Sequence, residues 1–364
     1  MLAYIRHIPP SLAGGRLAHV YKEIRSEVPR VPNLMQVFSL RPETMAGIYR
    51  SWLANMWNGR VARQTKELLA LAVSRAADCD YCVDAHLVFL QAAGMDRAQA
   101  HDIERMLADS EALGEREREA VRFGIRMTED PRSVTAGECE SLRKAWPEEE
   151  ERTEIISVIA AFNTITRICN ALGVALEIPP ALRRFDAGRR GAIALMSRLT
   201  AIGVDLSSAR PLAARSPEEN RRDIESLFRA QLGFGAMPPG FNQLESCPEV
   251  FDGQLRLMEK AVAVVPRDRW MRVGLVVGRL TGCRYIALNC GAWLDQRGVE
   301  AAEVIAASEG VSTSLPDVEQ ACLRYVRDLT LYSHAIDEKR VDGLRMVGLS
   351  DGAILDLAFV GGLF

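Results

Sequence analysis

The stretch Cys79-Asp80-Tyr81-Cys82-Val83-Asp84-Ala85-His86 is the most informative part of this sequence. It places two thiols and an imidazole at the spacing C-x-x-C-x-x-x-H. Residues 79–93 have helical composition, Asp78 is a suitable N-cap, and a glycine follows the segment. Cys82 and His86 are four residues apart and therefore share one face of a helix. The motif predicts a helix that starts at the first thiol and carries a thiol and a base side by side.

The start of a helix is a favourable place for a reactive thiol. Its free N–H groups and partial positive charge stabilise a thiolate relative to a thiol. A C-x-x-C pair in such surroundings is the usual arrangement for thiol–disulfide chemistry. The sequence therefore indicates redox sulfur chemistry at Cys79 and Cys82, with His86 as a candidate base.

The overall composition is that of a globular protein with two domains. The chain has 364 residues, of which 48% are hydrophobic and 26% are charged, and its net charge of −3 does not suggest a nucleic-acid or anionic-membrane partner. It contains no apolar run of about 18 residues and no N-terminal leader pattern, so we expect a cytoplasmic protein. The eight cysteines should then be reduced at rest, which favours a catalytic or metal-binding role for the C-x-x-C pair.

Helical patterns run through most of the sequence. Apolar residues recur at helical spacing, and no segment sustains the alternation of period two that a strand requires. We therefore predict an all-α fold. In the first half, the expected helices cover residues 65–76, 79–93, 97–107, 115–127, 135–145 and 149–172, and the helix at 135–145 begins with a capping-box pattern.

The second half of the sequence repeats the first. A shift of 204 residues aligns the segments around the thiols without gaps, and a shift of 206 fits the flank before them. Aligned pairs include Cys79 with Cys283, Gly94 with Gly298 and Gly47 with Gly253. We therefore predict two tandem domains, 1–188 and 189–364. Their connection is expected between residues 178–180 and 216–217, where prolines and arginines cluster.

The two copies are unequal in their chemistry. Glu67, Cys82 and His86 of the first copy align with Met271, Ile286 and Cys290 of the second. The second copy therefore lacks both the C-x-x-C pair and the base. We interpret it as a degenerate, structural copy that supplies a packing surface.

Glu67 extends the motif to E-x11-C-x-x-C-x-x-x-H. This pattern resembles that of the alkylhydroperoxidase D-like proteins, within the carboxymuconolactone decarboxylase superfamily. The segment from Phe162 to Arg167 is similar to an F-N-x-x-x-R segment on the last helix of peroxidase-related members. The resemblance covers the region from Val31 to Gly173, and the second half resembles the family only as a decayed copy.

The resemblance implies a mechanism for a thiol-dependent peroxidase. Cys82 would attack the hydroperoxide, Cys79 would resolve the sulfenic acid as a disulfide, His86 would relay the proton, and Glu67 would orient His86. An external dithiol or a thioredoxin-like reductant would restore the thiols, with no haem, flavin or metal cofactor. The resemblance also implies a homo-oligomer, either a trimer of pseudo-dimers or a dimer. One departure is Tyr81, where some members carry a second histidine, and it is expected to weaken or retune the activity.

Other interpretations of the same residues remain open. The thiol pair could serve a disulfide reductase that does not use peroxide. Alternatively, Cys79 and Cys82 could bind zinc, with His86 and Glu67 as third and fourth ligands, in a helical scaffold that binds metal or senses oxidants. Tyr81 and Tyr285 are interpreted as packing residues. The remaining cysteines, Cys139, Cys169, Cys247 and Cys322, are interpreted as small buried hydrophobic residues.

Overall fold

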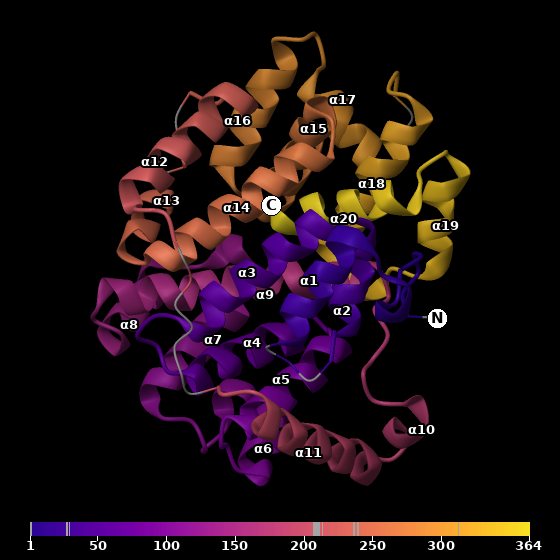
Figure 1. Cartoon of the computed structure of the whole chain (residues 1–364). Helices are drawn as coiled ribbons and strands as arrows, with labels where there is room; N and C mark the ends of the chain where they lie inside the picture. The colour runs from indigo at the N-terminus through magenta and orange to yellow at the C-terminus, as the bar shows by residue number, and fades with distance from the viewer. Residues whose placement is uncertain are drawn as a thin grey trace.

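The computed structural model is helical throughout, and it describes residues 2–26, 28, 30–206, 212, 214–235, 237–238, 240–311 and 313–364. No strand occurs among these residues, so the predicted all-α class is confirmed. Helices of the first half form the lower part of the molecule in Figure 1, and those of the second half form the upper part. None of the helices in the described ranges is long and apolar enough to span a membrane. Only α19 and α20 together meet that test, as a pair bent by 118°.

The first half contains the helices that hold the predicted site. Their bounds are α1 Gly15–Arg25, α2 Asn33–Val37, α3 Pro42–Trp57, α4 Arg63–Ala76, α5 Asp80–Ala92, α6 Arg97–Met106, α7 Glu115–Glu129, α8 Ala136–Ala145 and α9 Glu149–Ala171, with short 3-10 turns at Pro10–Leu12, Phe38–Leu40, Leu107–Asp109 and Pro131–Ser133. The expected helices are all present, and the capping box at the start of α8 forms between Thr135 and Glu138.

The start of α5 differs from the sequence prediction. Cys79, not Asp78, is the N-cap, and its sulfur makes no capping hydrogen bond. Asp78 has a φ of 50° and lies in the tight turn between α4 and α5. In that turn the N–H of Cys79 donates to the carbonyl of Ser74 at 2.9 Å. The turn is too short for Asp78 to serve as the cap, and it sets the first thiol at the mouth of α5.

Helix α4 is the central helix of the first half. It packs against α5, α7 and α9, and every residue from Thr65 to Ser74 is buried. Leu69 and Val73 contribute to its apolar contacts, while Lys66 and Glu67 carry charge into the core. A buried charge needs a partner, so these two side chains mark places where α4 is held by specific ion pairs.

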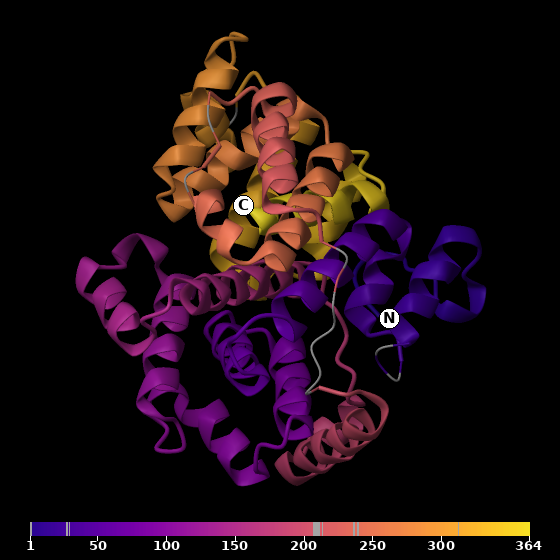
Figure 2. The same cartoon turned by 60° about the vertical axis from the view of Figure 1, so that its left-hand side comes forward.

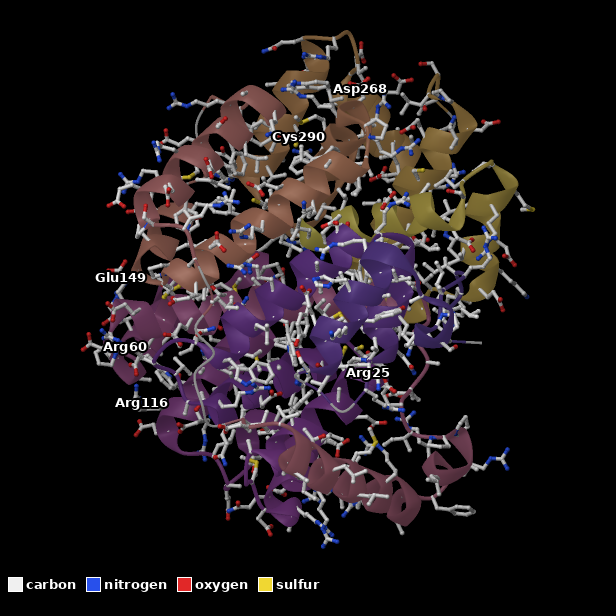
Figure 3. All side chains as sticks on the ribbon, viewed as in Figure 1. Arg25, Arg60, Arg116, Glu149, Asp268 and Cys290 are labelled. Atoms are coloured by element: carbon white, nitrogen blue, oxygen red, sulfur yellow. The ribbon has the colours of Figure 1, made fainter. Side chains whose placement is uncertain are left out.

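The second half is also built of helices. Their bounds are α14 Pro248–Val264, α15 Arg267–Thr281, α16 Arg284–Asp295, α17 Ala301–Ser308, α18 Asp317–Tyr332, α19 Glu338–Met346 and α20 Asp351–Leu363, with the short elements η6 Leu244–Ser246 and η7 Ser333–Ala335. Central α15 packs against α16, α17, α18 and α20, much as α4 packs against its neighbours. Cys290, labelled in Figure 3, lies among these helices, and Arg60, Arg116 and Glu149 mark the side of the molecule where α9 begins.

The two halves meet through α3 and α14 in a symmetric way. A Cβ atom at Gly47 would meet Leu257 and Lys260 of α14, and a Cβ atom at Gly253 would meet Ser51 and Ala54 of α3. These contacts are related by the shift of 206 residues that the sequence repeat predicts. Equivalent residues facing each other across one contact are typical of an isologous, two-fold interface. The arrangement supports the predicted duplication.

The segment between the halves is helical and folds back on the first half. It contains α10 Pro180–Arg183, α11 Asp186–Gly203, α12 Pro217–Ser226, the π-helix Leu227–Leu232 and α13 Gly240–Gln243. Helix α11 packs on α5, at the end of the molecule opposite α16 and α17 in Figures 1 and 2. The predicted domain boundary at 188/189 therefore falls inside α11, and residues 207–211 and 213 of the predicted connection lie outside the described residues.

Candidate functional site

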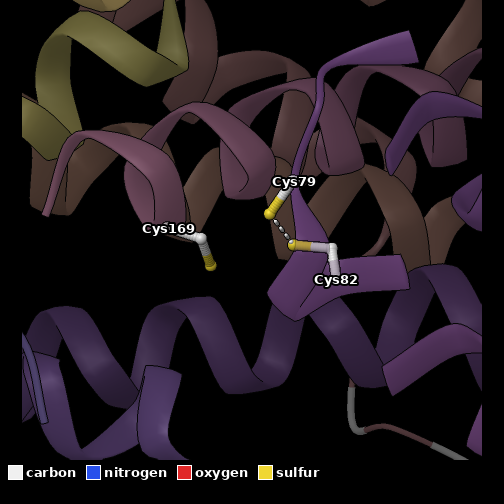
Figure 4. Close-up of side chains that lie close together, drawn as sticks. All are labelled: Cys79, Cys82 and Cys169. Carbon is white, nitrogen blue, oxygen red and sulfur yellow. Dashed lines mark hydrogen bonds between the residues drawn. The ribbon is translucent and has the colours of Figure 1, made fainter. Parts of the chain in front are cut away.

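The two thiols of the motif lie side by side at the start of α5. Their Sγ atoms are 2.8 Å apart, and Cys79 and Cys82 are 0% and 2% exposed (Figure 4). Both are free thiols. Because one residue is the N-cap and the other lies in the first turn, the start of the helix brings the two sulfurs together without distortion elsewhere.

Glu67 and His86 form a buried pair next to the thiols. The α4–α5 hairpin brings the Glu67 carboxylate to the imidazole, with 2.6 Å between Oε2 and Nδ1. Glu67 is 0% exposed and His86 is 4% exposed. Arg63 contacts the other carboxylate oxygen, with its Nε 2.8 Å from Oε1, and stacks on Trp57 at 3.8 Å. Sequence spacing suggested the pairing with His86, whereas Arg63 as a third member was not predicted.

The charges in this pair determine which ring nitrogen is free. Burial opposes ionisation of Glu67, but Arg63 and His86 outweigh it and lower the pKa of the carboxyl below its usual value. An ionised carboxylate can only accept hydrogen bonds, so Nδ1 of His86 must carry the hydrogen. Nε2 then remains as the nitrogen that can exchange a proton. The edge-to-face contact of the ring with Phe162, at 4.5 Å between centroids, restrains the imidazole further.

The two thiols differ in how readily they ionise. Burial disfavours the Cys79 thiolate, but hydrogen bonds with Cys169 and Cys82 and the charge of His86 lower its pKa well below the usual value. Burial raises the pKa of Cys82, and its contacts with Cys169 and Cys79 raise it further. One negative charge shared within the cluster is therefore held at Cys79, with Cys82 as its neutral neighbour.

Cys169 is the residue that sequence analysis missed. We had interpreted it as a small buried hydrophobic residue, but its sulfur lies with those of Cys79 and Cys82, all three within 4.8 Å of one another (Figure 4). One signal was available in the sequence: Cys169 lies seven residues after Phe162 and therefore shares its face of α9. Because Phe162 contacts His86, the same face continues to the thiols.

The three thiols also define the candidate metal ligands among the described residues. Thiolates of Cys79, Cys82 and Cys169 are close enough to share one ion, and three such ligands suit a soft or borderline cation. The ligand set predicted for zinc was different. Glu67 is held by His86 and Arg63, and among the described residues neither Glu67 nor His86 belongs to the group of ligand atoms that lie close together. The structure therefore favours a thiol-only set over the mixed set.

A cavity of about 580 Å³ opens beside the thiols, and its lining is mostly apolar. Cys82 and His86 both contribute to its wall, together with Phe89 and Phe162, whereas Cys79 does not. The cavity is therefore in contact with both Cys82 and His86. This volume falls within the range of small-molecule sites in proteins.

Tyr81 lines the same cavity and also makes polar contacts. Its hydroxyl lies 3.2 Å from Oε1 of Glu177 and accepts a hydrogen bond from the N–H of Leu34 at 3.2 Å. Burial and the nearby Glu177 carboxylate raise the pKa of Tyr81 well above its usual value, so the hydroxyl stays protonated. Tyr81 therefore combines the predicted packing role with hydrogen bonds that join α5 to the chain beyond α9.

The other cysteines, and the residues of the second half that align with the site, lie apart from the thiol cluster. Cys247 and Cys322 are buried as expected, but Cys139 is exposed because it lies on the solvent side of α8. In the second copy, Met271 and Cys290 are buried at the positions equivalent to Glu67 and His86. Among the described residues, the cluster of thiols with the buried carboxylate–imidazole pair occurs in the first half.

Helix α11 covers the opposite face of α5. Its Arg189 lies 2.7 Å from both Asp84 of the motif and Glu104 of α6, and Arg183 lies 3.2 Å from Asp84. Ile193 belongs to the same buried cluster as Leu87 on α5. The segment expected to be a connection therefore braces the helix that carries Cys82 and His86.

Comparisons with known proteins find similarity in the part of the chain that contains this site. Residues 42–126 match the carboxymuconolactone decarboxylase family. An alkyl hydroperoxide reductase of Mycobacterium tuberculosis is 35% identical over 91 residues, which make up 25% of this chain and 26% of that protein. The match thus spans about a quarter of the length of the curated relative.

Solved structures show more distant similarity. A peroxidase-related protein of Ralstonia eutropha with an alkylhydroperoxidase core is 20% identical, covers 54% of this chain and 97% of its own, and has a TM-score of 0.46. The debrominase Bmp8, solved with 2,3,4-tribromopyrrole, is 18% identical, covers 53% of this chain and 96% of its own, and has a TM-score of 0.43. The segment 42–126, which contains the thiol pair, Glu67 and His86, is thus the part of the chain that matches the carboxymuconolactone decarboxylase family.

Proposed function

We propose that the protein is a thiol-dependent peroxidase that reduces hydroperoxides at Cys82. The observation that carries this proposal is that His86, held by the buried Glu67, lines the same cavity as Cys82. A nucleophile, a base and a group that orients the base are the parts that activate a thiol in many enzymes. The similarity to an alkyl hydroperoxide reductase supports the same reaction.

The first step oxidises Cys82. His86 accepts the thiol proton at Nε2, while Glu67 holds Nδ1–H and balances the charge on the ring. The Cys82 thiolate attacks one peroxide oxygen, the O–O bond breaks, and the leaving alkoxide takes the proton from His86 to become an alcohol. Cys82 is left as a sulfenic acid. The raised pKa of Cys82 is the reason why this step needs a base beside it.

The second step forms the disulfide. The Cys79 thiolate, whose Sγ already lies 2.8 Å from that of Cys82, attacks the sulfenic sulfur, and hydroxide leaves and is protonated to water. The low pKa of Cys79 suits this role because it supplies a thiolate at neutral pH. In sum, two thiols and one hydroperoxide give a disulfide, an alcohol and water. An external dithiol or a thioredoxin-like reductant then reduces the disulfide.

The cavity favours organic hydroperoxides over hydrogen peroxide as substrates. Hydrogen peroxide gains nothing from an apolar wall, whereas an alkyl group buried there contributes about 0.8 kcal/mol for each methylene. Tyr81, at the position where some relatives carry histidine, provides a hydroxyl bonded to Glu177 and adds no second base. The cytoplasmic location, the homo-oligomer and the division at 188/189 remain predictions.

A single-turnover oxidation tests the proposal. Reduced protein is mixed with one equivalent of cumene hydroperoxide, and the cysteines are mapped by mass spectrometry in the wild type, in Cys82→Ser and in Cys322→Ser as a matched buried control. We expect a Cys79–Cys82 disulfide in the wild type and the control but not in Cys82→Ser. If the thiols stay reduced in cumene hydroperoxide but are oxidised by a disulfide substrate, the protein is a reductase and not a peroxidase.

The three-thiol cluster gives a reason to test one further candidate function. Cys79, Cys82 and Cys169 could hold a thiolate-binding cation such as zinc in a scaffold without enzymatic activity. Metal analysis of the purified protein separates the two functions. A stoichiometric ion that is released only on oxidation favours the scaffold, and a metal-free protein that turns over peroxide favours the enzyme.

A further inference from the structure

Cys169 lies within reach of the sulfur that the proposed function oxidises. The three sulfurs of Cys79, Cys82 and Cys169 are all within 4.8 Å of one another, and a disulfide has a bond length of about 2.05 Å. Closing a bond to Cys169 therefore requires a movement of less than roughly 3 Å, which side-chain rotation about χ1 can largely provide. Cys169 belongs to α9, so this bond would join α9 to α5.

We propose that Cys169 is a second resolving thiol for Cys82, forming a Cys82–Cys169 disulfide between α5 and α9. The inference rests on the proposed peroxidase function. In the step, the Cys169 thiol attacks the sulfenic sulfur of Cys82, the S–S bond forms, the S–O bond breaks, and hydroxide leaves with the proton of Cys169 as water. The same product forms by exchange, when Cys169 attacks Cys82 in the Cys79–Cys82 disulfide and Cys79 leaves as a thiolate.

The surroundings of the cluster support this role. Cys79 is the better leaving group of the two thiols in the first disulfide because its pKa is the lower. Cys169 is 2% exposed, so it is shielded from reductants and oxidants in solution but not from its neighbours. A second resolving thiol keeps Cys82 from remaining as a sulfenic acid, the state from which further peroxide makes irreversible sulfinic acid.

The test uses variants that remove the first resolving thiol. Cys79→Ser, with Cys79→Ala as a second variant, is treated with one equivalent of cumene hydroperoxide and digested without reduction. We expect a peptide pair joined by Cys82–Cys169. In Cys79→Ser/Cys169→Ala, Cys82 should instead remain a sulfenic acid that dimedone traps, while Cys79→Ser/Cys247→Ala, a buried cysteine outside the cluster, should still give the cross-link.

The outcomes separate this inference from the proposed function. Dimedone labelling of Cys82 in Cys79→Ser, with Cys169 still a free thiol, would overturn the role of Cys169 and leave the peroxidase in place. A Cys82 that stays reduced in every variant would overturn both. The single variant Cys169→Ala, which keeps Cys79, should also form several-fold more sulfinic acid at Cys82 than the wild type does in excess hydroperoxide. No increase would count against the inference.

Arg167 carries a second inference, from a separate observation. It lines the same cavity, whose described lining includes no aspartate or glutamate. Within the described residues, Arg167 forms no ion pair and no hydrogen bond, and burial lowers the pKa of its guanidinium with no neighbouring charge to oppose the shift. Arg167 as a whole is partly buried, and a cation that lines a mostly apolar cavity without a partner is costly for a fold to maintain. Such a group is explained when a ligand supplies the missing anion.

The position of Arg167 on α9 defines the shape of that ligand. Arg167 follows Phe162 by five residues and so points roughly 140° around the helix from the face that contacts His86. It follows Asn163 by one turn, and Asn163 donates to Thr128 of α7 at 3.0 Å. The cavity is lined by residues of both faces and therefore reaches around α9. An occupant that meets both Arg167 and Cys82 must be elongated.

We infer that the cavity binds an elongated apolar molecule that ends in a carboxylate, with the carboxylate on Arg167. For the proposed peroxidase, on which this inference also rests, the corresponding substrate is a long-chain fatty acid that carries a hydroperoxide on its alkyl chain. A guanidinium binds a carboxylate through two parallel N–H donors. The apolar wall between Arg167 and Cys82 accommodates the chain.

Binding of palmitate, with methyl palmitate as the neutral comparison, tests this without any turnover. Wild-type protein should bind the acid more tightly than the ester. Arg167→Gln should weaken acid binding by roughly 10- to 100-fold, as expected for a hydrogen bond to a charged group, and should abolish the preference over the ester. Arg167→Lys should keep part of the preference for the acid. Arg143→Gln, on the surface of α8, should have no effect on binding. Equal binding of acid and ester by the wild type would overturn the inference even if the peroxidase activity is established.

Discussion

Glu67 lies at the centre of the site, and its side chain is completely buried. Its carboxylate is held between Arg63 and His86, and it keeps the proton of His86 on Nδ1. The tautomer of His86, the proposed base, is therefore set by a residue from the preceding helix. This dependence gives the proposed mechanism an order: the nucleophile depends on His86, and His86 depends on Glu67.

Removing His86 should slow oxidation of Cys82 more than removing the charge of Glu67. His86→Ala should lower the second-order rate constant with cumene hydroperoxide by roughly 10²- to 10⁴-fold, since it removes the proton acceptor. Glu67→Gln should have a smaller effect because the amide can still orient the ring. Stopped-flow mixing of reduced protein with hydroperoxide measures both. His101→Ala, which removes a histidine paired with Glu104 outside the cavity, is the control, and an equal loss in that variant would indicate a general effect on the fold.

The Cys79 thiolate should be visible by titration. Because its pKa is lowered, thiolate absorbance at 240 nm should persist well below pH 8.5, the approximate value for a free cysteine. Cys169→Ala and Cys82→Ser each remove a hydrogen-bonding partner and should move the transition to higher pH. A first transition near pH 8.5 in the wild type would contradict the assignment of the charge to Cys79.

Residues close in sequence were predictable, and those distant in sequence were not. Cys79, Cys82 and His86 belong to one helix, whose periodicity alone brings them together, and Glu67 follows from the hairpin. Cys169 comes from α9, and its seven-residue spacing from Phe162 shows that the two share a helix face but not that this face reaches the thiols. That information is contained in the packing of α9 on α4 and α5.

At the scale of elements, a buried ion pair sets the position of α4. Lys66 Nζ lies 3.0 Å from Oε2 of Glu154 on α9, and the same carboxylate accepts from the N–H groups of Arg60 and Val61 at 2.7 and 3.0 Å. The loop before α4 thus wraps around Glu154. Gly59, with a φ of 97°, is required there because a Cβ atom would lie 2.2 Å from that carboxylate carbon.

Loss of this carboxylate should destabilise the first half. Glu154→Ala leaves Lys66 buried without its partner, and we expect a loss of about 3–5 kcal/mol in the free energy of unfolding. Glu151→Ala on the same helix removes an exposed contact with Arg116 and should cost less than about 1 kcal/mol. Urea unfolding of both variants measures the difference, and similar values for the two would show that the buried pair does not anchor α4.

The helices themselves were largely predictable because their signals are local. The expected ranges in the first half agree with the observed bounds within two residues, and the capping box formed as predicted. The exception is the start of α5, where the tight turn after α4 overrides the capping preference of Asp78. The packing of α11 on α5 was missed because its arginine pairs with Asp84 and Glu104 join segments far apart in sequence.

At the scale of the whole molecule, the two halves are joined by α3 and α14 and by ion pairs. Arg41 lies 2.6 Å from Asp356, Arg50 lies 2.9 Å from Asp252, and Arg6 lies 3.0 Å from Asp351. These pairs connect the N-terminal half to α14 and α20. The second half therefore forms part of the support for α9 and the cavity, and its interpretation as a structural copy stays a prediction.

The glycine pair at this interface gives a matched test. Gly253→Ala would place its Cβ 3.1 Å from that of Ala54 and 3.3 Å from the backbone of Ser51, whereas Gly47→Ala would meet the side chains of Lys260 at 3.5 Å and Leu257 at 3.9 Å, which are ordinary contacts. Both changes gain the same helix propensity, up to about 1 kcal/mol. We expect Gly253→Ala to be less stable than Gly47→Ala by about 1–3 kcal/mol in thermal or urea unfolding. Equal stability of the two variants would show that α3 and α14 do not approach as closely as described.

The central claim is that Cys82 reduces a hydroperoxide. The most direct measurement is the product of one turnover: reduced protein is mixed with excess cumene hydroperoxide without a reductant, and cumyl alcohol and free thiols are counted together. We predict a first rapid phase of one alcohol and two thiols lost per chain in the wild type, and neither in Cys82→Ser. Alcohol formation that persists in Cys82→Ser, or thiol loss without alcohol, would contradict the account.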